Sequence, residues 1–194
     1  DPRMSAALFA AVEVLVAQGA EVVELNSPEL ADAAQHWLAV CAVDALIAHK
    51  DFYPAQAASY GPAFRALLDH GAQVSAAEYA RATRQRQATR ALLDELLTGI
   101  DVMVCPAAPA PAGRQADFGP QDVMPDEAIA PLVRYSAPTN FSGHPSITLP
   151  NGFTDDGLPL AMQFIGRHGD EAAIIRAAAA YEAATEWHTR RPPL

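Results

Sequence analysis

The side chains of this sequence that could do chemistry are few and widely spaced. There are six histidines, two cysteines and a single lysine, Lys50. The histidines, at positions 36, 49, 70, 144, 168 and 188, show no pair at the i, i+4 spacing that places two ligands on one helix face, so we expect no metal site. A thiol nucleophile would require Cys105 beside a distant histidine. Because Cys105 closes the apolar run DVMVC (101–105), which predicts a buried strand, we expect no cysteine catalysis.

Motifs that bind cofactors or activate a nucleophile are also missing from the sequence. It contains no Gly-x-Gly-x-x-Gly, no phosphate-binding loop and no Gly-x-Ser-x-Gly elbow. His144 lies between Gly143 and Pro145, and we expect a surface or loop histidine there rather than a general base. Cys41, in an Ala-rich helical pattern, is expected to be a small buried hydrophobe. We therefore assign no catalytic residue, no cofactor and no metal ligand.

The composition is that of a single globular domain. The chain has 194 residues, of which 51% are apolar and 19% charged. Its net charge of −10 disfavours nucleic-acid binding, which needs clustered Lys and Arg. We find no apolar run of about 20 residues and no signal-peptide pattern, so we expect a cytoplasmic protein without membrane contact. The start, Asp1-Pro2-Arg3, leads almost directly into a helix without Met, which suggests the remnant of a tag, a processed chain or a piece of a longer one.

The order of hydrophobic patterns predicts an α/β fold, in which part of a mixed β-sheet is flanked by helices. Helices are expected at 4–18, 28–49, 63–69, from Ser75 to Gly99, 126–134 and 171–187. Strands are expected at 21–25, 101–105, 146–150 and 160–165. A long loop should occupy 106–125. We expect the last three strands to share one sheet, with the last two antiparallel through turn residues at 151–157, and the 171–187 helix packed on one face.

Three polar features could have a functional role. Four arginines lie along one face of the helix that Ser75 opens, and we expect a solvated face there rather than a carboxylate-binding cluster (Arg81, Arg84, Arg86 and Arg90). Gln163 lies mid-strand among apolar neighbours, where a buried amide must be hydrogen-bonded, so we expect it to tie its strand to an adjacent loop. Asn140 can both donate and accept, and we expect it to pin a loop more than to contact a substrate directly.

Taken in order, several segments resemble the C-terminal part of amidase signature family enzymes. These are IDVMVCPAAPAPAG (100–113), Tyr135 with PTNFSGHPSITLPNG (138–152), GLPLAMQFIG (157–166), and Glu171 with a closing helix ending in EWHTRRP (186–192). Ser146 and Ala161 stand where the family commonly has Ala and Gly. The resemblance covers nearly the whole chain and implies a largely buried sheet covered by helices. It also implies loops at Cys105–Arg114 and Tyr135–Gly143, at strand ends where pockets form.

The resemblance implies amide hydrolysis by a serine nucleophile, which a second serine and a lysine activate through an acyl-enzyme mechanism. In the family these residues come from a Gly/Ser-rich segment and a lysine that precede the part resembled here. The chain has no Gly-Gly or Ser-Ser dipeptide, and Lys50 matches no family motif. We therefore expect residues 1–194 to be the C-terminal segment of an amidase domain rather than a complete catalytic domain, inactive alone.

By this interpretation the chain supplies sheet strands and pocket loops, and Tyr135, Asn140, Phe141 and Gln163 are the candidate substrate-binding residues. The implied partners are the N-terminal catalytic part of the same polypeptide, or a second copy, and a small amide substrate. No cofactor is implied. Two alternatives remain: a non-catalytic structural or binding partner chain derived from an amidase, and an unrelated α/β ligand-binding domain. Ammonia transfer onto a charged tRNA, as in the family's amidotransferases, would need further subunits.

Overall fold

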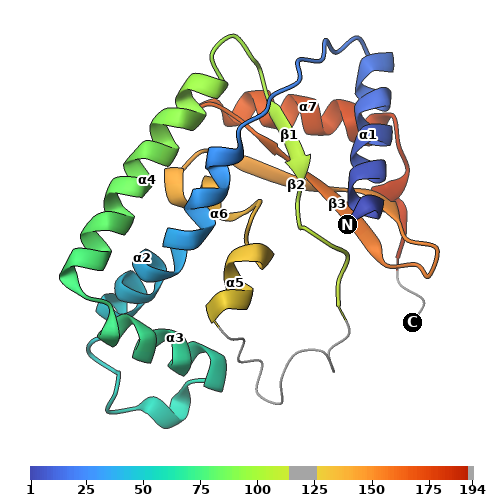
Figure 1. Cartoon of the computed structure of the whole chain (residues 1–194). Coiled ribbons are helices and arrows are strands. Elements are labelled where there is room, and N and C mark those ends of the chain that lie inside the picture. Colours follow the sequence, from blue (N-terminus) through green and yellow to red (C-terminus); the bar gives the residue numbers. More distant parts are fainter. Residues whose placement is uncertain (114–125, 192–194) are drawn as a thin grey trace.

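A computed structural model describes residues 1–113 and 126–191 (Figure 1). In chain order the elements are α1 (Pro2–Ala17), a 3-10 turn (Pro28–Ala31), α2 (Asp32–Ala48), a 3-10 turn (Ala57–Ser59), α3 (Pro62–Gln73), α4 (Ala76–Leu96), β1 (Met103–Pro106), α5 (Asp126–Leu132), α6 (Ala137–Ser142), β2 (Ser146–Phe153), β3 (Pro159–Ile165), α7 (Glu171–Ala183) and a 3-10 turn (Trp187–Thr189). This arrangement confirms the expected α/β class.

The sheet has the order β1-β3-β2, with both pairs antiparallel. Phe164 in the central strand lies opposite Val104 of β1 and Ile147 of β2. The prediction that these three strands share a sheet, with β2 and β3 antiparallel, is therefore confirmed. Asn151-Gly152 does not form the expected turn. Both residues lie inside β2, at an irregularity in its register against β3 between Pro150 and Gly152.

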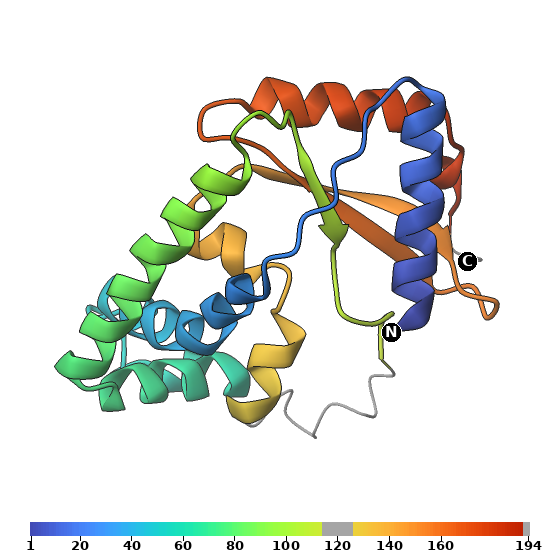
Figure 2. The same cartoon turned by 45° about the horizontal axis from the view of Figure 1, so that its top comes forward.

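Helices α1 and α7 cover the sheet and together with it form the first hydrophobic core (Figures 1 and 2). This core contains large side chains that are almost fully buried: Leu149, Met162, Phe164, Ile174 and Tyr181. The predicted packing of the last helix on the sheet is confirmed by its contacts with β2 and β3. Asp170 begins α7, since its carboxylate accepts a hydrogen bond from the backbone N–H of Ala173. We call α1, β1–β3 and α7 the sheet region.

The other helices, α2, α3, α4 and α6, form a second core that we call the helical region. Its buried residues are mostly small: Ala33, Ala39, Val40, Ala82 and Phe141. Ser75 begins α4 as expected, because its hydroxyl accepts from the N–H of Glu78. The segment Pro28–Ala48 is long and apolar enough to span a membrane. Length and composition alone are weak evidence of a span, and its alanine face is buried in this core.

Three local predictions are wrong. Residues 21–25 form no strand, and Val22 and Val23 are 60% and 67% exposed, because the segment crosses from α1 to the helical region without pairing to the sheet. Helix α3 does not close at Gly71 but continues to Gln73, since the glycine packs directly against α2. The expected loop Tyr135–Gly143 is largely the short helix α6. The expected loop at 106–125 lies mostly outside the described residues. So do Arg114, the last residue of the loop expected from Cys105, and residue 192, the last of the segment EWHTRRP.

Candidate functional site

Cys105, Tyr135 and Gln163 meet where β1 and β3 face the start of α6. The register places Gln163 opposite Cys105, so their side chains lie side by side. Gln163 is 4% exposed, and its Nε2 donates a hydrogen bond of 2.6 Å to the backbone carbonyl of Tyr135. The same nitrogen lies 3.3 Å from Cys105 Sγ. The expectation that Gln163 ties its strand to the neighbouring connection is confirmed.

The Cys105 thiol is poorly suited to be a nucleophile. Burial disfavours the thiolate and raises the pKa of Cys105 to about 11, with the Gln163 hydrogen bond opposing the shift. The attacking species in thiol chemistry is the thiolate, of which almost none exists at neutral pH with such a pKa. Lys50 is exposed in the turn after α2, within the helical region. That neither residue is catalytic remains a prediction.

A cleft of about 950 Å³ runs along the outer edge of β1. Its walls come from the end of α1 and the segment that follows, the end of α4, the strand itself, the start of α6 and α7. Among the described residues, β1 pairs only with β3, so its other edge faces this cleft. Val102, Val104 and Cys105 contribute apolar surface, and the charged residues at the walls are Glu21, Asp101, Arg134 and Arg176. A concave cleft with both apolar and charged lining is a usual form of a ligand-binding or interface site.

The four predicted site residues do not converge on one point. Tyr135 lines the cleft, and Gln163 holds the backbone of Tyr135 in place. Asn140 is exposed on α6. Phe141 is only 2% exposed and packs in the alanine-rich core of the helical region, while its carbonyl accepts a 3.0 Å hydrogen bond from Arg86 Nε. Asn140 and Phe141 do not line the cleft. A substrate contact remains a prediction for all four residues.

The arginine face of α4 is mostly exposed, but one of its arginines contacts α6. Its four arginines are exposed, as expected for a solvated surface. Arg86 nevertheless donates to the backbone carbonyl of Phe141, and so links α4 to α6. The sequence could not indicate this contact, because the acceptor is a backbone group on an element far along the chain.

The expectation of a surface or loop histidine at position 144 is confirmed in part. His144 lies in the connection between α6 and β2, but its side chain is fully buried rather than at the surface, because α4 packs over that connection. There it lies beside Asp94 and His168. Local spacing cannot reveal this group, since the three residues come from three separate elements. Only the packing of α4 against two connections brings them together.

Comparison with known proteins places these features in context. A family model described as Amidase matches residues 1–175. A putative amidase AmiD from Mycobacterium tuberculosis is 39% identical over 153 residues, covering 79% of this chain and 32% of the relative. An amidase from Pseudomonas putida is 33% identical over 198 residues, covering 100% and 42%. The A subunit of the glutamyl-tRNA(Gln) amidotransferase from Chloroflexus aggregans is 29% identical over 220 residues, covering 100% and 43%.

Solved structures of similar fold include a 6-aminohexanoate cyclic dimer hydrolase in complex with its substrate. It has a TM-score of 0.81 at 20% identity, and the match covers 99% of this chain and 43% of that one. A bacterial aryl acylamidase described as an amidase signature enzyme has a TM-score of 0.77 at 23% identity, covering 97% and 41%. The chain thus spans less than half the length of the relatives that it matches.

Proposed function

Because this chain belongs to the amidase family, we propose that it is the C-terminal segment of an amide hydrolase, one that supplies sheet strands and a cleft wall while the catalytic residues lie upstream in the intact polypeptide. The reaction of that polypeptide would be attack by a serine on an amide carbonyl, release of the amine, and hydrolysis of the acyl-enzyme by water. The serine, its second serine and its lysine are those implied by the family resemblance.

The observation that carries this proposal is the open edge of β1 beside the 950 Å³ cleft. An exposed strand edge presents unpaired backbone groups that favour pairing with a further strand. The same edge borders Cys105 and Tyr135, so a segment that extended the sheet here would also close over the predicted pocket residues. The share of the relatives that this chain covers, 32% to 43%, leaves ample length for such a segment.

The side chains available here support a positioning role rather than a catalytic one. Gln163 fixes the backbone of Tyr135 at the cleft wall. Arg134, the residue before Tyr135, also lines the cleft. Such a wall orients a substrate and excludes water, which are contributions that pocket loops make without performing bond chemistry. The partly buried Cys105 thiol, with its raised pKa, and the exposed Lys50 offer no activated nucleophile or base.

A segment exchange tests the proposal. The matched segment of the Pseudomonas putida amidase would be replaced by this chain, and hydrolysis of a panel of aryl and aliphatic amides would be measured. We expect turnover that a serine-directed inhibitor abolishes, with the unmodified amidase as the positive control. A hybrid that folds cooperatively but hydrolyses none of the amides that its parent accepts would contradict the proposal and favour a non-catalytic partner chain.

The same reasoning extends to association. We propose that the open β1 edge is covered by the N-terminal part of the intact polypeptide or, in its absence, by a second copy of this chain. Light scattering on the purified chain, with mass spectrometry of any co-purifying fragment, tests this. We expect a mass above 20.6 kDa or a bound fragment. A monodisperse monomer with a cooperative thermal transition would show that the segment is a self-sufficient domain.

A further inference from the structure

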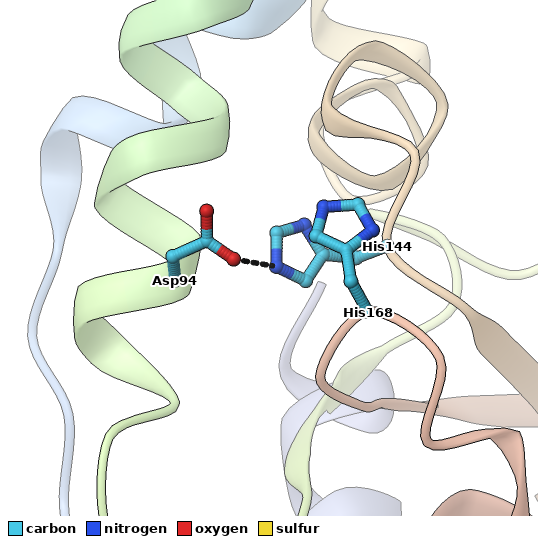
Figure 3. Close-up of side chains that lie close together, drawn as sticks. All are labelled: Asp94, His144 and His168. Atoms are coloured by element: carbon cyan, nitrogen blue, oxygen red, sulfur yellow. Dashed lines mark ion pairs between the residues drawn. The ribbon is translucent and has the colours of Figure 1, made fainter.

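Three potential metal ligands meet at the junction of the helical and sheet regions (Figure 3). Asp94 lies on the last turns of α4, His144 lies between α6 and β2, and His168 lies between β3 and α7. One ligand atom from each residue lies within 4.8 Å of the others. The group uses no residue of the cleft described above.

Ser142 contacts one ring nitrogen of His144, and the other ring nitrogen faces the cluster. Nδ1 lies 2.9 Å from the hydroxyl of Ser142, and that hydroxyl directs its own hydrogen to the carbonyl of Thr139 at 3.5 Å. With its hydrogen directed there, the Ser142 oxygen accepts from Nδ1–H, and in the tautomer that results the lone pair lies on Nε2. A hydrogen bond of this kind on the far nitrogen is the usual support of a metal-binding histidine.

His144 Nε2 faces the carboxylate of Asp94. Oδ1 of Asp94 lies 3.2 Å from Nε2, which is buried and makes no hydrogen bond of acceptable geometry. A lone pair facing a carboxylate oxygen is unfavourable unless a cation lies between them.

His168 supplies the third group. Its ring centroid lies 3.9 Å from that of His144, and its Nε2 is also buried without a hydrogen-bond partner. Two buried imidazole nitrogens without hydrogen-bond partners in one place are costly, because each has lost its water. The exposed Arg90, one turn before Asp94 on α4, adds a positive charge that also acts on His144.

We propose that Asp94, His144 and His168 bind one divalent first-row transition-metal ion, of which zinc is the best match. Two imidazoles and one carboxylate are a common zinc ligand set. Tetrahedral zinc places its ligand atoms about 3.3 Å apart, close to the 3.2 Å between His144 Nε2 and Asp94 Oδ1. Other ligand atoms of the group lie up to 4.8 Å apart. The Asp94 side chain is 53% exposed, so it can move to shorten its distances to the two imidazoles. Water would complete the coordination.

The site would act as a cross-link. Its three ligands come from three elements, with α4 in the helical region and the β3–α7 connection in the sheet region. Binding to the folded chain and not to the unfolded one would stabilise the junction by linkage. This inference is independent of amide hydrolysis, because no ligand lines the cleft.

Zinc binding by the purified chain tests this inference, measured by competition with a chromophoric zinc chelator and by thermal unfolding with and without zinc. We expect one zinc ion per chain and a raised Tm, whereas Mg²⁺, which prefers oxygen ligands, should have no effect. Asp94→Asn and His168→Gln should each weaken zinc binding at least about tenfold and remove the rise in Tm. Both positions are at least partly exposed, so these variants should fold.

The matched control is His188→Gln, which removes an exposed histidine outside the cluster. Its zinc affinity should stay within about twofold of the parent chain. The proposal is overturned if the chain binds no zinc. It is equally overturned if Asp94→Asn and His168→Gln bind as tightly as the parent, because zinc would then be held by other histidines.

Discussion

The sheet region and the helical region bury their surfaces in different ways. Around the sheet, the core consists of large side chains such as Phe164, Met162 and Tyr181, each at most 1% exposed. Between the helices, the buried side chains are mainly alanines, and Gly71 brings α3 directly onto the backbone of α2. The sheet region therefore depends on the volume of its side chains, and the helical region depends on the close approach of its backbones. Truncating a buried side chain should therefore destabilise the sheet region most. Enlarging a buried residue should destabilise the helical region most.

Truncation of Phe164 to alanine should have the largest effect. The side chain is completely buried between α1, α7 and the neighbouring strands, so its removal leaves a cavity in a packed core. We expect the free energy of unfolding, from urea titration, to fall by about 3–5 kcal/mol. The control is Ile175→Ala in the same region, since Ile175 is 56% exposed, and its effect should stay within about 0.5 kcal/mol. Equal losses for the two variants would contradict the account of the sheet core.

The opposite face of β3 provides the second test. Gln163→Leu keeps the side-chain volume but removes the donor to the carbonyl of Tyr135. We expect a loss of about 1–3 kcal/mol in the free energy of unfolding, because a buried carbonyl loses its partner. Gln163→Glu, with one oxygen in place of the donor, should do no better. An unchanged free energy for Gln163→Leu would show that the contact does not hold the Tyr135 connection.

Enlargement in the helical region is the third test. A Cβ on Gly71 would lie 2.3 Å from the carbonyl oxygen of Ala42, a backbone atom that cannot move aside. Gly71→Ala should cost about 1–3 kcal/mol from overpacking, reduced by up to about 1 kcal/mol of better helix propensity. A Cβ added at Gly61 would meet nothing within 4 Å, so Gly61→Ala should cost less than Gly71→Ala and only through the weaker N-cap preference of alanine. A stabilised Gly71→Ala chain would refute the close contact between α2 and α3.

The smallest expected effect is a difference in thiol reactivity between Cys41, in α2 of the helical region, and Cys105, in β1 of the sheet region. Burial raises the pKa of both thiols, that of Cys105 to about 11. Iodoacetamide at pH 8 should therefore label Cys41 before Cys105, which mass spectrometry of the peptides will show. Since the folded pKa of Cys105 lies above its ordinary value of 9.0, this contribution to stability is complete below pH 9 and is lost as the pH rises toward about 11. Faster labelling of Cys105 would contradict its burial.

Much of the sheet region can be predicted from sequence, because alternating residues and capping residues report local structure. The alternation of Ile147 and Leu149 with polar residues indicates β2, and Asp170 marks the start of α7. Such local signals do not predict the structure of a segment whose conformation depends on residues distant in the sequence. Residues 21–25 have the composition of a strand, yet no strand among the described residues pairs with them. Propensity cannot supply the partner that a strand requires.

In the candidate site, too, some residues can be predicted from local sequence and others cannot. A mid-strand amide must find a partner, so the role of Gln163 can be predicted, although the identity of that partner cannot. His144 has the local pattern of a turn residue because of Gly143 and Pro145. Its burial depends on α4, whose position against the α6–β2 connection is a matter of tertiary packing. The resemblance names Phe141 as a pocket residue. Its side chain packs in the helical core, which sequence could not indicate, and its contact with a substrate remains a prediction.

The most direct test of the central claim is an amide-hydrolysis assay on the unmodified 194-residue chain. The claim is that this segment walls a cleft without containing the catalytic residues. Aryl and aliphatic amides should show no turnover above buffer at any pH between about 6 and 9, while the Pseudomonas putida amidase hydrolyses its substrates in parallel. Turnover by the purified chain that a serine-directed inhibitor abolishes would contradict the claim, because it would place a working nucleophile within these residues.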